Sequence, residues 1–205
     1  MKYCSFVVGD IMTNCYLLWS NKEAGVIDPG GPVDEVIGFI KKKGLVLKWI
    51  VNTHGHADHI AGNRILRKEF DVPILIHEPD QEMLTDPTAN LSVFMGKGIT
   101  SPEADKLLKE DDTLSLDAET LRVIDTPGHT PGGISLYTPG LLFAGDTLFF
   151  ESIGRTDLPG GDQEQLLESV RKRLLTLPQE TIVLPGHGEA TTIGHESQSN
   201  PFLAI

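Results

Sequence analysis

Short apolar runs rich in β-branched residues recur along the chain, and most of them are bounded by Gly, Pro, Asn or Asp. These runs predict buried strands over residues 3–8, 15–19, 24–27, 46–52, 73–76, 121–125, 133–137, 141–144 and 181–184. Stretches whose apolar residues repeat at a helical period lie between several of the strands. The resulting mixture of strands and helices predicts an α/β (α+β) fold.

Three helices are predicted from this period. The clearest covers residues 162–177 and begins at a capping residue, Asp162. A second spans about residues 32–43 and stops at Gly44, and a third starts near Asp58. The third helix would place the residues just before it at a strand-to-helix turn, where α/β proteins usually build their sites.

Residues 86–112 lack a clear period and mix Pro, Gly, Thr and charged residues. This composition predicts a long loop with a short helix near 102–109, which either flanks a pocket or packs as a plain surface connection. The chain contains no repeat, low-complexity tract or interdomain linker, so we expect one domain over residues 1–205.

Composition narrows the classes of function. Of the 205 residues, 40% are hydrophobic, but no apolar run is long enough for a signal peptide or a membrane span. We therefore expect a soluble, cytoplasmic protein with no membrane partner. The formal net charge of −12 argues against binding to nucleic acid, which requires clustered Lys and Arg. No heptad seam or apolar stripe predicts an oligomeric state.

The chain has two cysteines, Cys4 and Cys15, and each lies inside an apolar run. Their positions predict buried thiols rather than a disulfide or a nucleophile. The chain also has no Gly-x-Ser-x-Gly motif. Catalysis through a side-chain nucleophile is therefore disfavoured.

Three imidazoles and one carboxylate lie within six residues in the sequence Thr53-His54-Gly55-His56-Ala57-Asp58-His59. This is the nitrogen and oxygen ligand set that transition metals prefer. Three later residues also follow predicted strands in Gly-rich turns, namely His129, Asp146 and His187. Seven such groups exceed the needs of one tetrahedral ion and suit two divalent ions. We expect zinc, with iron or manganese as alternatives, since imidazole and carboxylate accept all three.

The two remaining histidines stand outside these turns. His77 ends a strand before Glu78-Pro79, and His195 lies in a polar C-terminal segment. We assign both to structural or surface roles.

The pattern His-x-His-x-Asp-His, followed by Gly-His, Gly-Asp and Gly-His, resembles the metallo-β-lactamase superfamily from about residue 14 to the C-terminus. The resemblance implies a four-layer αβ/βα sandwich with the metals in a cleft at one edge of two sheets. It also implies a ligand set: His54, His56 and His129 for the first metal, Asp58, His59 and His187 for the second, and Asp146 as a bridge.

Within that superfamily, Gly145-Asp146-Thr147-Leu148-Phe149 and Pro185-Gly186-His187-Gly188 resemble the glyoxalase II group, which hydrolyses S-acylglutathione thioesters. Classical members add a helical domain, and they carry Lys-Phe-Tyr where this chain has Arg155-Thr156-Asp157. The chain is more similar to short, single-domain bacterial glyoxalase II-like hydrolases. Residues 152–157, and the ending from Gly194-His195-Glu196 through Asn200-Pro201-Phe202-Leu203, are typical of them.

The resemblance implies hydrolysis of a small-molecule thioester such as S-lactoylglutathione by a metal-bridging hydroxide, which Asp58 orients while it also binds metal. Arg155 either binds a carboxylate of the substrate or pairs with Asp157. The Gly-Arg-Thr-Asp element also resembles the persulfide dioxygenases, single-iron relatives that use only the positions matching His54, His129 and Asp146. A third reading, in a different class, is a metal-dependent binding module without turnover.

Overall fold

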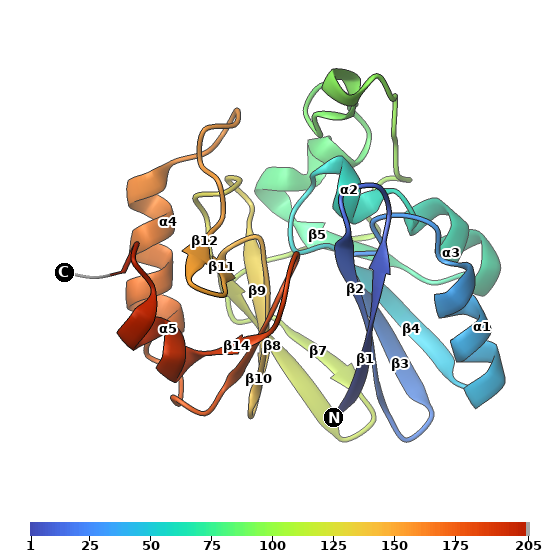
Figure 1. The fold of residues 1–205 in the computed structure, drawn as a ribbon. Coiled ribbons are helices and arrows are strands. Elements are labelled where there is room, and N and C mark those ends of the chain that lie inside the picture. Colours follow the sequence, from blue (N-terminus) through green and yellow to red (C-terminus); the bar gives the residue numbers. More distant parts are fainter. Residues whose placement is uncertain (204–205) are drawn as a thin grey trace.

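The computed structural model describes residues 1–203 as two sheets that face each other, with helices on both outer faces (Figure 1). The first six-stranded sheet contains, in spatial order, β1 (Lys2–Val8), β2 (Thr13–Ser20), β3 (Glu23–Ile27), β4 (Val46–Val51), β5 (Ile74–His77) and β6 (Lys106–Leu108). The second contains β14 (Thr191–Thr192), β13 (Ile182–Pro185), β10 (Leu141–Gly145), β9 (Ile134–Thr138), β8 (Glu119–Asp125) and β7 (Thr113–Leu116). A short hairpin pairs β11 (Leu148–Phe149) with β12 (Ser152–Ile153).

Helices complete the two outer layers. On the side of the first sheet lie α1 (Asp34–Lys43), α2 (Ala57–Ile60) and α3 (Asn63–Phe70), and on the side of the second lie α4 (Gln163–Ser169) and α5 (Ile193–Ser199) (Figure 1). Short 3₁₀ turns η1 (Glu78–Leu84) and η2 (Ser92–Met95) follow β5, and a π-helical turn, η3 (Val170–Leu174), continues α4. The α/β class and the four-layer αβ/βα sandwich are both confirmed.

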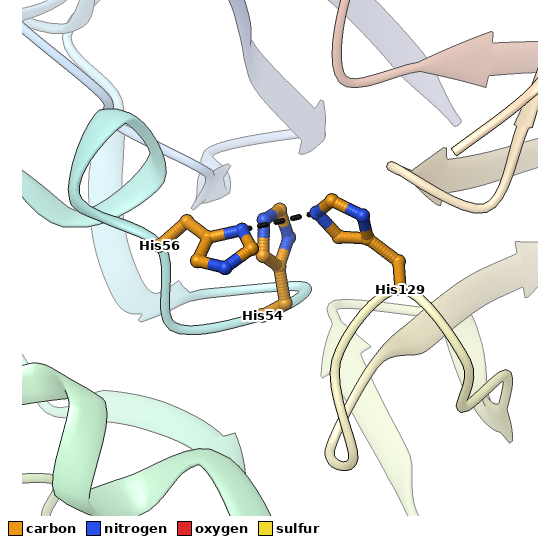
Figure 2. A group of neighbouring side chains, drawn as sticks. All are labelled: His54, His56 and His129. Atoms are coloured by element: carbon orange, nitrogen blue, oxygen red, sulfur yellow. Dashed lines mark hydrogen bonds between the residues drawn. The ribbon is translucent and has the colours of Figure 1, made fainter. Parts of the chain in front are cut away.

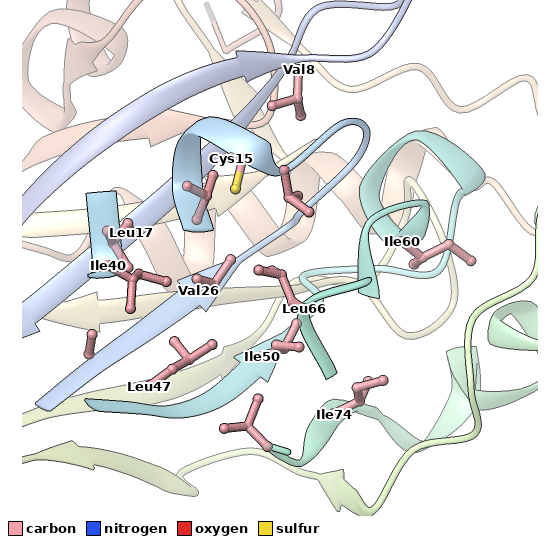
Figure 3. Packing of buried hydrophobic residues seen from close by; sticks show 14 of the residues in the cluster. Val8, Cys15, Leu17, Val26, Ile40, Leu47, Ile50, Ile60, Leu66 and Ile74 are labelled. Carbon is pink, nitrogen blue, oxygen red and sulfur yellow. The ribbon is translucent and has the colours of Figure 1, made fainter. Parts of the chain in front are cut away.

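Each strand of a sheet buried on both faces sends alternate side chains into two different cores. On β2, Cys15 and Leu17 pack into the cluster between the first sheet and its helices, part of which Figure 3 shows. Their neighbours Tyr16 and Leu18 pack into the cluster between the two sheets. A third cluster fills the space between the second sheet and α4. Because both faces of these strands are buried, their sequences are unbroken apolar runs.

Two of the predicted helices have the expected ends. The side chain of Asp162 accepts a hydrogen bond from the backbone N–H of Gln165 and caps α4. Gly44 ends α1 in the left-handed conformation, with φ of 61°. The third predicted helix is divided into α2 and α3 at Gly62, because its backbone N–H donates to the carbonyl of Pro29 at 2.6 Å.

The helix predicted near residues 102–109 is wrong. Residues Lys106–Leu108 form β6, which pairs in parallel with β5 at the edge of the first sheet. The carboxylate of Asp105 accepts a hydrogen bond from the backbone N–H of Ile74 at 2.9 Å and fixes the chain beside β5. Strand hydrogen bonds with an existing sheet edge therefore decide the structure of a segment whose sequence has no clear period. Within residues 1–203, no helix is long and apolar enough to span a bilayer.

Candidate metal centre

Seven potential metal ligands meet at one edge of the two sheets because their turns follow strands that end there. β4 runs parallel to β3, and β10 runs parallel to β13, so the carboxyl ends within each pair lie at the same edge. The turn after β4 and the helix α2 supply His54, His56, Asp58 and His59, while the turns after β8, β10 and β13 supply His129, Asp146 and His187. The structure thus brings together all seven residues selected from the sequence.

The first triad consists of His54, His56 and His129, whose nearest ring nitrogens all lie within 4.8 Å of one another. Figure 2 shows the three rings converging from two separate turns, with Nδ1 of His56 3.0 Å from Nε2 of His129. All three side chains are buried. Nε2 of His54 and Nε2 of His56 have no hydrogen-bond partner among the described residues. Buried polar atoms are rarely left unpaired, so these two nitrogens fit the role of metal ligands.

The second triad consists of Asp58, His59 and His187. Nε2 of His187 lies 3.2 Å from Oδ2 of Asp58 and 3.3 Å from Nε2 of His59. Nε2 of His59 in turn lies 3.5 Å from Oδ2 of Asp58. His59 is fully buried, whereas His187 and Asp58 are partly exposed toward the same pocket.

Asp146 lies between the two triads. Its Oδ2 is 3.6 Å from Nε2 of His129 in the first triad and 3.6 Å from Nε2 of His187 in the second. Its Oδ1 is 3.5 Å from Nε2 of His59 and is buried without a hydrogen-bond partner in the described chain. The carboxylate is therefore placed to contact cations held by either triad.

The spacing of these atoms fits divalent cations. Tetrahedral coordination at about 2.0–2.1 Å places neighbouring nitrogen or oxygen ligands about 3.3 Å apart. The distances given above for the pair His56 and His129, for the second triad and for Asp146 run from 3.0 Å to 3.6 Å, and the first triad as a whole lies within 4.8 Å. The donor types, their spacing and their unpaired buried atoms together indicate a divalent metal site.

The electrostatic environment keeps part of the site ready to ligate. Burial, reinforced by the neighbouring imidazoles, lowers the pKa of His54 well below its ordinary value and lowers the pKa of His56 to about 3. Both rings are therefore neutral near pH 7, as metal ligation requires. Burial would also lower the pKa of His59, but Asp58, Asp146 and Asp28 outweigh it and raise that pKa to about 10.

Contacts from outside the two triads indicate which ring nitrogen of His54 and of His59 faces the centre. The hydroxyl of Thr53 donates to Asp28 at 2.6 Å, so its oxygen is free to accept from Nδ1 of His54 at 3.2 Å. Asp28 also lies 3.0 Å from Nδ1 of His59. A proton on Nδ1 of His54 leaves its Nε2 lone pair directed into the site, while Nδ1 of His59 faces Asp28 and its Nε2 faces the second triad.

His129 is oriented in the same way by a backbone group. Its Nδ1 lies 2.7 Å from the carbonyl oxygen of Arg155, a natural acceptor for a ring N–H. Its Nε2 consequently faces the first triad. The loop after β12 thus orients His129 through the backbone of Arg155 and not through a side chain.

The turn that carries His187 is held by β2 of the opposite sheet. The backbone N–H of Asn14 donates to the carbonyl of Gly186 at 2.7 Å, and its side-chain amide donates to Pro185 and Gly188. The hydroxyl of Tyr16 also donates to the carbonyl of Pro185, at 2.7 Å. The two sheets are therefore joined directly behind the second triad.

Three supporting residues were not singled out from the sequence: Asn14, Asp28 and Asp80. Asp28 and Asp80 are buried carboxylates, and each accepts hydrogen bonds from turns that carry ligands. Asp28 follows β3 in an Asp-Pro-Gly segment, which reads as an ordinary turn. The only sequence signal for Asp28 was its position as a short polar residue after a buried strand. Many ordinary turn residues have the same position, so this signal could not single it out.

Members of both triads, together with Asp146, line a pocket of about 760 Å³, which is within the size range of small-molecule sites. Arg155 lines it, and its guanidinium donates two hydrogen bonds to the carboxylate of Asp157 at 2.8 Å and 2.7 Å. His77 and His195 belong to none of the clustered ligand groups: His77 lies beside Asp125, and His195 stacks on Phe150.

Comparisons with known proteins agree with this geometry. The family model of the metallo-beta-lactamase superfamily matches residues 8–187. The probable metallo-hydrolase YqgX of Bacillus subtilis is 41% identical over 99% of this chain and 98% of its own length. The hydroxyacylglutathione hydrolase GloC of Haemophilus influenzae is 38% identical over 93% of this chain and 92% of its own length.

Solved structures show the same relationship. The BLEG-1 B3 metallo-beta-lactamase superposes with a TM-score of 0.95 at 41% identity, with full coverage of both chains. ETHE1 from Myxococcus xanthus gives 0.83 at 28% identity over 98% of this chain and 84% of that one. TTHA1623, solved in a di-iron-bound form, gives 0.87 at 36% identity over 98% and 100%. The chain therefore belongs to the metallo-β-lactamase superfamily, a family of metallo-hydrolases.

Proposed function

We propose that this protein is a thioester hydrolase that holds two divalent cations and acts on a small-molecule substrate. The observation that carries the proposal is the position of Asp146 between two complete triads, members of which line a pocket. The similarity to a hydroxyacylglutathione hydrolase supports the same class of reaction. Zinc is the expected metal, with iron or manganese as alternatives.

Each residue of the centre has a defined part in this proposal. His54, His56 and His129 would hold one cation, Asp58, His59 and His187 the other, and Asp146 would contact both. Divalent cations act as Lewis acids, and they lower the pKa of a coordinated water from 15.7 to about 7. The hydroxyl of Thr13 donates to Oδ2 of Asp58 at 3.2 Å and orients that carboxylate, which would accept a hydrogen bond from the attacking water.

Within residues 1–203, no cysteine lines the pocket as a competing nucleophile. The chain's two cysteines, Cys4 and Cys15, are free thiols that pack with the cluster beneath the first sheet. Burial raises the pKa of the Cys15 thiol far above its ordinary value, so the reactive thiolate does not form near neutral pH. Water is therefore the expected nucleophile.

The leaving group also suits the site. Thiols have pKa values of only about 8–9, so a thiolate departs without a strong general acid. The only carboxyl groups that line the pocket, in the part of the chain described, are the candidate ligands Asp58 and Asp146. Ester or amide cleavage would place a heavier demand on proton donation.

A persulfide dioxygenase that uses one iron is the second candidate, and the similarity to ETHE1 from Myxococcus xanthus favours it. The two functions differ in their need for the second triad. A dinuclear hydrolase requires Asp58, His59 and His187, whereas the single-iron relatives use only the positions of His54, His129 and Asp146.

The test combines metal analysis of the natively purified protein with two assays. Two metals per chain and thiol release from S-lactoylglutathione are expected for the hydrolase, and treatment with a chelator should abolish the release. One iron per chain and oxygen uptake on glutathione persulfide would instead indicate the dioxygenase. Bound metal without turnover of either substrate class would indicate a binding module.

A variant of the second triad sharpens the choice. His187→Ala should remove one of two metals and most thioesterase activity, because the second triad contains no fourth His, Cys, Asp or Glu within residues 1–203. His195→Ala is the matched control, since His195 stands outside the clustered ligand groups. A His187→Ala variant with one iron and full oxygen uptake would overturn the hydrolase in favour of the dioxygenase.

A further inference from the structure

Many of the side chains that line the pocket beside the metal centre are apolar. Two separate segments contribute them on one side: Ile11 comes from the turn between β1 and β2, and Leu91, Phe94 and Met95 come from the region of η2. We call these four residues the apolar rim. Opposite them, Phe149, Ile153 and Leu158 come from the β11–β12 hairpin and the loop after it.

Three members of the apolar rim are exposed although they are large and hydrophobic. Phe94 is 77% exposed, and Ile11 and Met95 are exposed to a lesser degree. A contiguous exposed apolar patch beside a polar centre is typical of a binding surface. It is continuous with the candidate metal centre, since the same pocket includes His56 and His187.

The segment that carries the rim is held firmly at its base. The side-chain amide of Asn90 donates to the carbonyls of Met83 and Ile99, both at 2.9 Å. The backbone carbonyl of Asn90 accepts a hydrogen bond from the backbone N–H of Ala57, beside the turn that carries His54 and His56, at 3.1 Å. Leu91 follows in the left-handed conformation, with φ of 68°. A non-glycine residue keeps this conformation only where its surroundings enforce it, so the rim is preorganised.

The charges around the pocket are already paired. Arg155 is the only lysine or arginine that lines the pocket within residues 1–203, and Asp157 accepts both of its hydrogen bonds. Lys97, two residues after Met95, lies 2.5 Å from the carboxylate of Asp10, which precedes Ile11. This second pair joins the two segments of the rim. A substrate with several carboxylates would therefore find no unpaired cation in the pocket wall.

We propose that the thioester cleaved at this centre carries an uncharged apolar group, of the size of an aryl or short branched alkyl chain, that packs against the apolar rim. The inference rests on the proposed thioester hydrolysis. In that reaction the acyl C–S bond breaks and a C–O bond forms, while water supplies the hydroxyl to the acyl carbon and a proton to the departing thiolate. The rim takes no part in these steps and acts through substrate binding alone.

The test compares matched thioesters with the metal-loaded protein, with thiol release as the readout. S-acetylglutathione, S-(phenylacetyl)glutathione and S-benzyl thioacetate differ in whether an apolar ring is present and on which side of the sulfur it lies. We expect kcat/KM to be about tenfold higher for at least one ring-bearing substrate than for S-acetylglutathione, the discrimination that an apolar pocket typically achieves. S-lactoylglutathione is included as the polar reference.

Two variants of the same helical turn make the comparison sharper. Phe94→Ser should raise KM for the ring-bearing substrate about tenfold, and it should raise KM for S-acetylglutathione much less, because the acetyl group does not reach the apolar rim. Val93→Ser is the control, because Val93 is 49% exposed on the same turn but does not line the pocket. Binding of the uncharged fluorophore N-phenyl-1-naphthylamine to the metal-free protein should weaken in Phe94→Ser and not in Val93→Ser.

The outcomes separate the two proposals. Equal effects of Phe94→Ser and Val93→Ser, or a preference for S-lactoylglutathione over both ring-bearing substrates, would overturn the apolar class and leave thioester hydrolysis standing. Cleavage of none of the four thioesters would overturn the proposed function and this inference with it.

Discussion

The carboxylate of Asp80 accepts a hydrogen bond from the hydroxyl of Thr130 at 2.7 Å, although 50 residues separate the two along the chain. The same carboxylate oxygen accepts from the backbone N–H of Gly55 at 3.0 Å, and the other oxygen accepts from Gly132 at 2.7 Å. Gly55 lies between His54 and His56, and Thr130 follows His129. One buried side chain therefore joins the two turns that supply the first triad.

Removal of this junction should weaken both folding and metal binding. Asp80→Ala leaves three buried donors without an acceptor, so we expect the free energy of unfolding of the metal-free protein to fall by about 3 kcal/mol. We also expect metal affinity to fall about 10-fold to 100-fold, as for other groups that orient ligands. Denaturant titration and metal competition measure the two effects.

The control for this prediction lies on the same turn. Glu82 is exposed on η1, and its side chain makes no hydrogen bond with any of residues 1–203, so Glu82→Ala should change neither the free energy of unfolding nor the metal affinity by much. If Asp80→Ala lost stability but kept the metal affinity of the parent protein, Asp80 would serve the fold and not the centre.

Gly186 provides a way to disturb the centre without deleting any ligand. A Cβ atom at this position would lie 2.1 Å from Oδ1 of Asp146 and 2.8 Å from Cε1 of His59. The backbone of Gly186 is held on both sides, by hydrogen bonds with Gly145 and Asn14, so the carboxylate has to move. Gly186→Ala should therefore lower metal content and thioesterase activity together, which elemental analysis and a thiol-release assay would show. Full metal occupancy with normal turnover would contradict the position given to Asp146.

At Gly38, in contrast, a substitution by alanine should stabilise the protein. Gly38 lies exposed in the interior of α1, and a Cβ atom built there meets nothing within 4 Å. Alanine restricts the unfolded chain more than glycine does, so Gly38→Ala should raise the free energy of unfolding by about 0.5–1 kcal/mol. Metal content should not change. A loss of stability in a thermal or denaturant scan would show that α1 is packed differently from the structure.

The ligand cluster could be found from the sequence because its residues lie at short, recognisable spacings along the chain. His54, His56, Asp58 and His59 sit at close spacing, and His129, Asp146 and His187 each follow a glycine after a buried strand. The strands themselves were readable because burial on both faces produces unbroken apolar runs. Because the ligand residues all follow predicted strands, their meeting at one edge of the two facing sheets is consistent with the sequence pattern.

The sequence was less informative where tertiary contacts decide. Lys106–Leu108 become a strand only because β5 offers an edge. The hairpin of β11 and β12 has strands of two residues each, too short for any period to show. The roles of Asp28 and Asp80 depend on partners at 25 and 50 residues' distance, which no local pattern records. The apolar rim has no sequence signature either, because Leu91, Phe94 and Met95 lie in a segment without a clear period and Ile11 lies in a different turn.

The C-terminal helix supports the far wall of the pocket through another buried carboxylate, that of Glu196. Its Oε1 accepts from the hydroxyl of Thr191 at 2.6 Å, and its Oε2 accepts from the backbone N–H of Glu151 at 3.0 Å. The side-chain amide of Asn200 donates to the same Oε2 and to the carbonyl of Ser152. Glu151 and Ser152 belong to the β11–β12 hairpin, so α5 fixes the element that carries part of the pocket lining.

Glu196→Ala should therefore change more than stability. Three donors lose their acceptor, which we expect to lower the free energy of unfolding by about 2–3 kcal/mol. The released hairpin carries Phe149 and Ile153 on the pocket wall, so KM for a cleaved thioester should rise several-fold while metal content stays the same. Gln198→Ala, on an exposed position of the same helix, is the control. An unchanged KM in Glu196→Ala, beside a clear loss of stability, would restrict this residue to a role in folding and detach α5 from substrate binding.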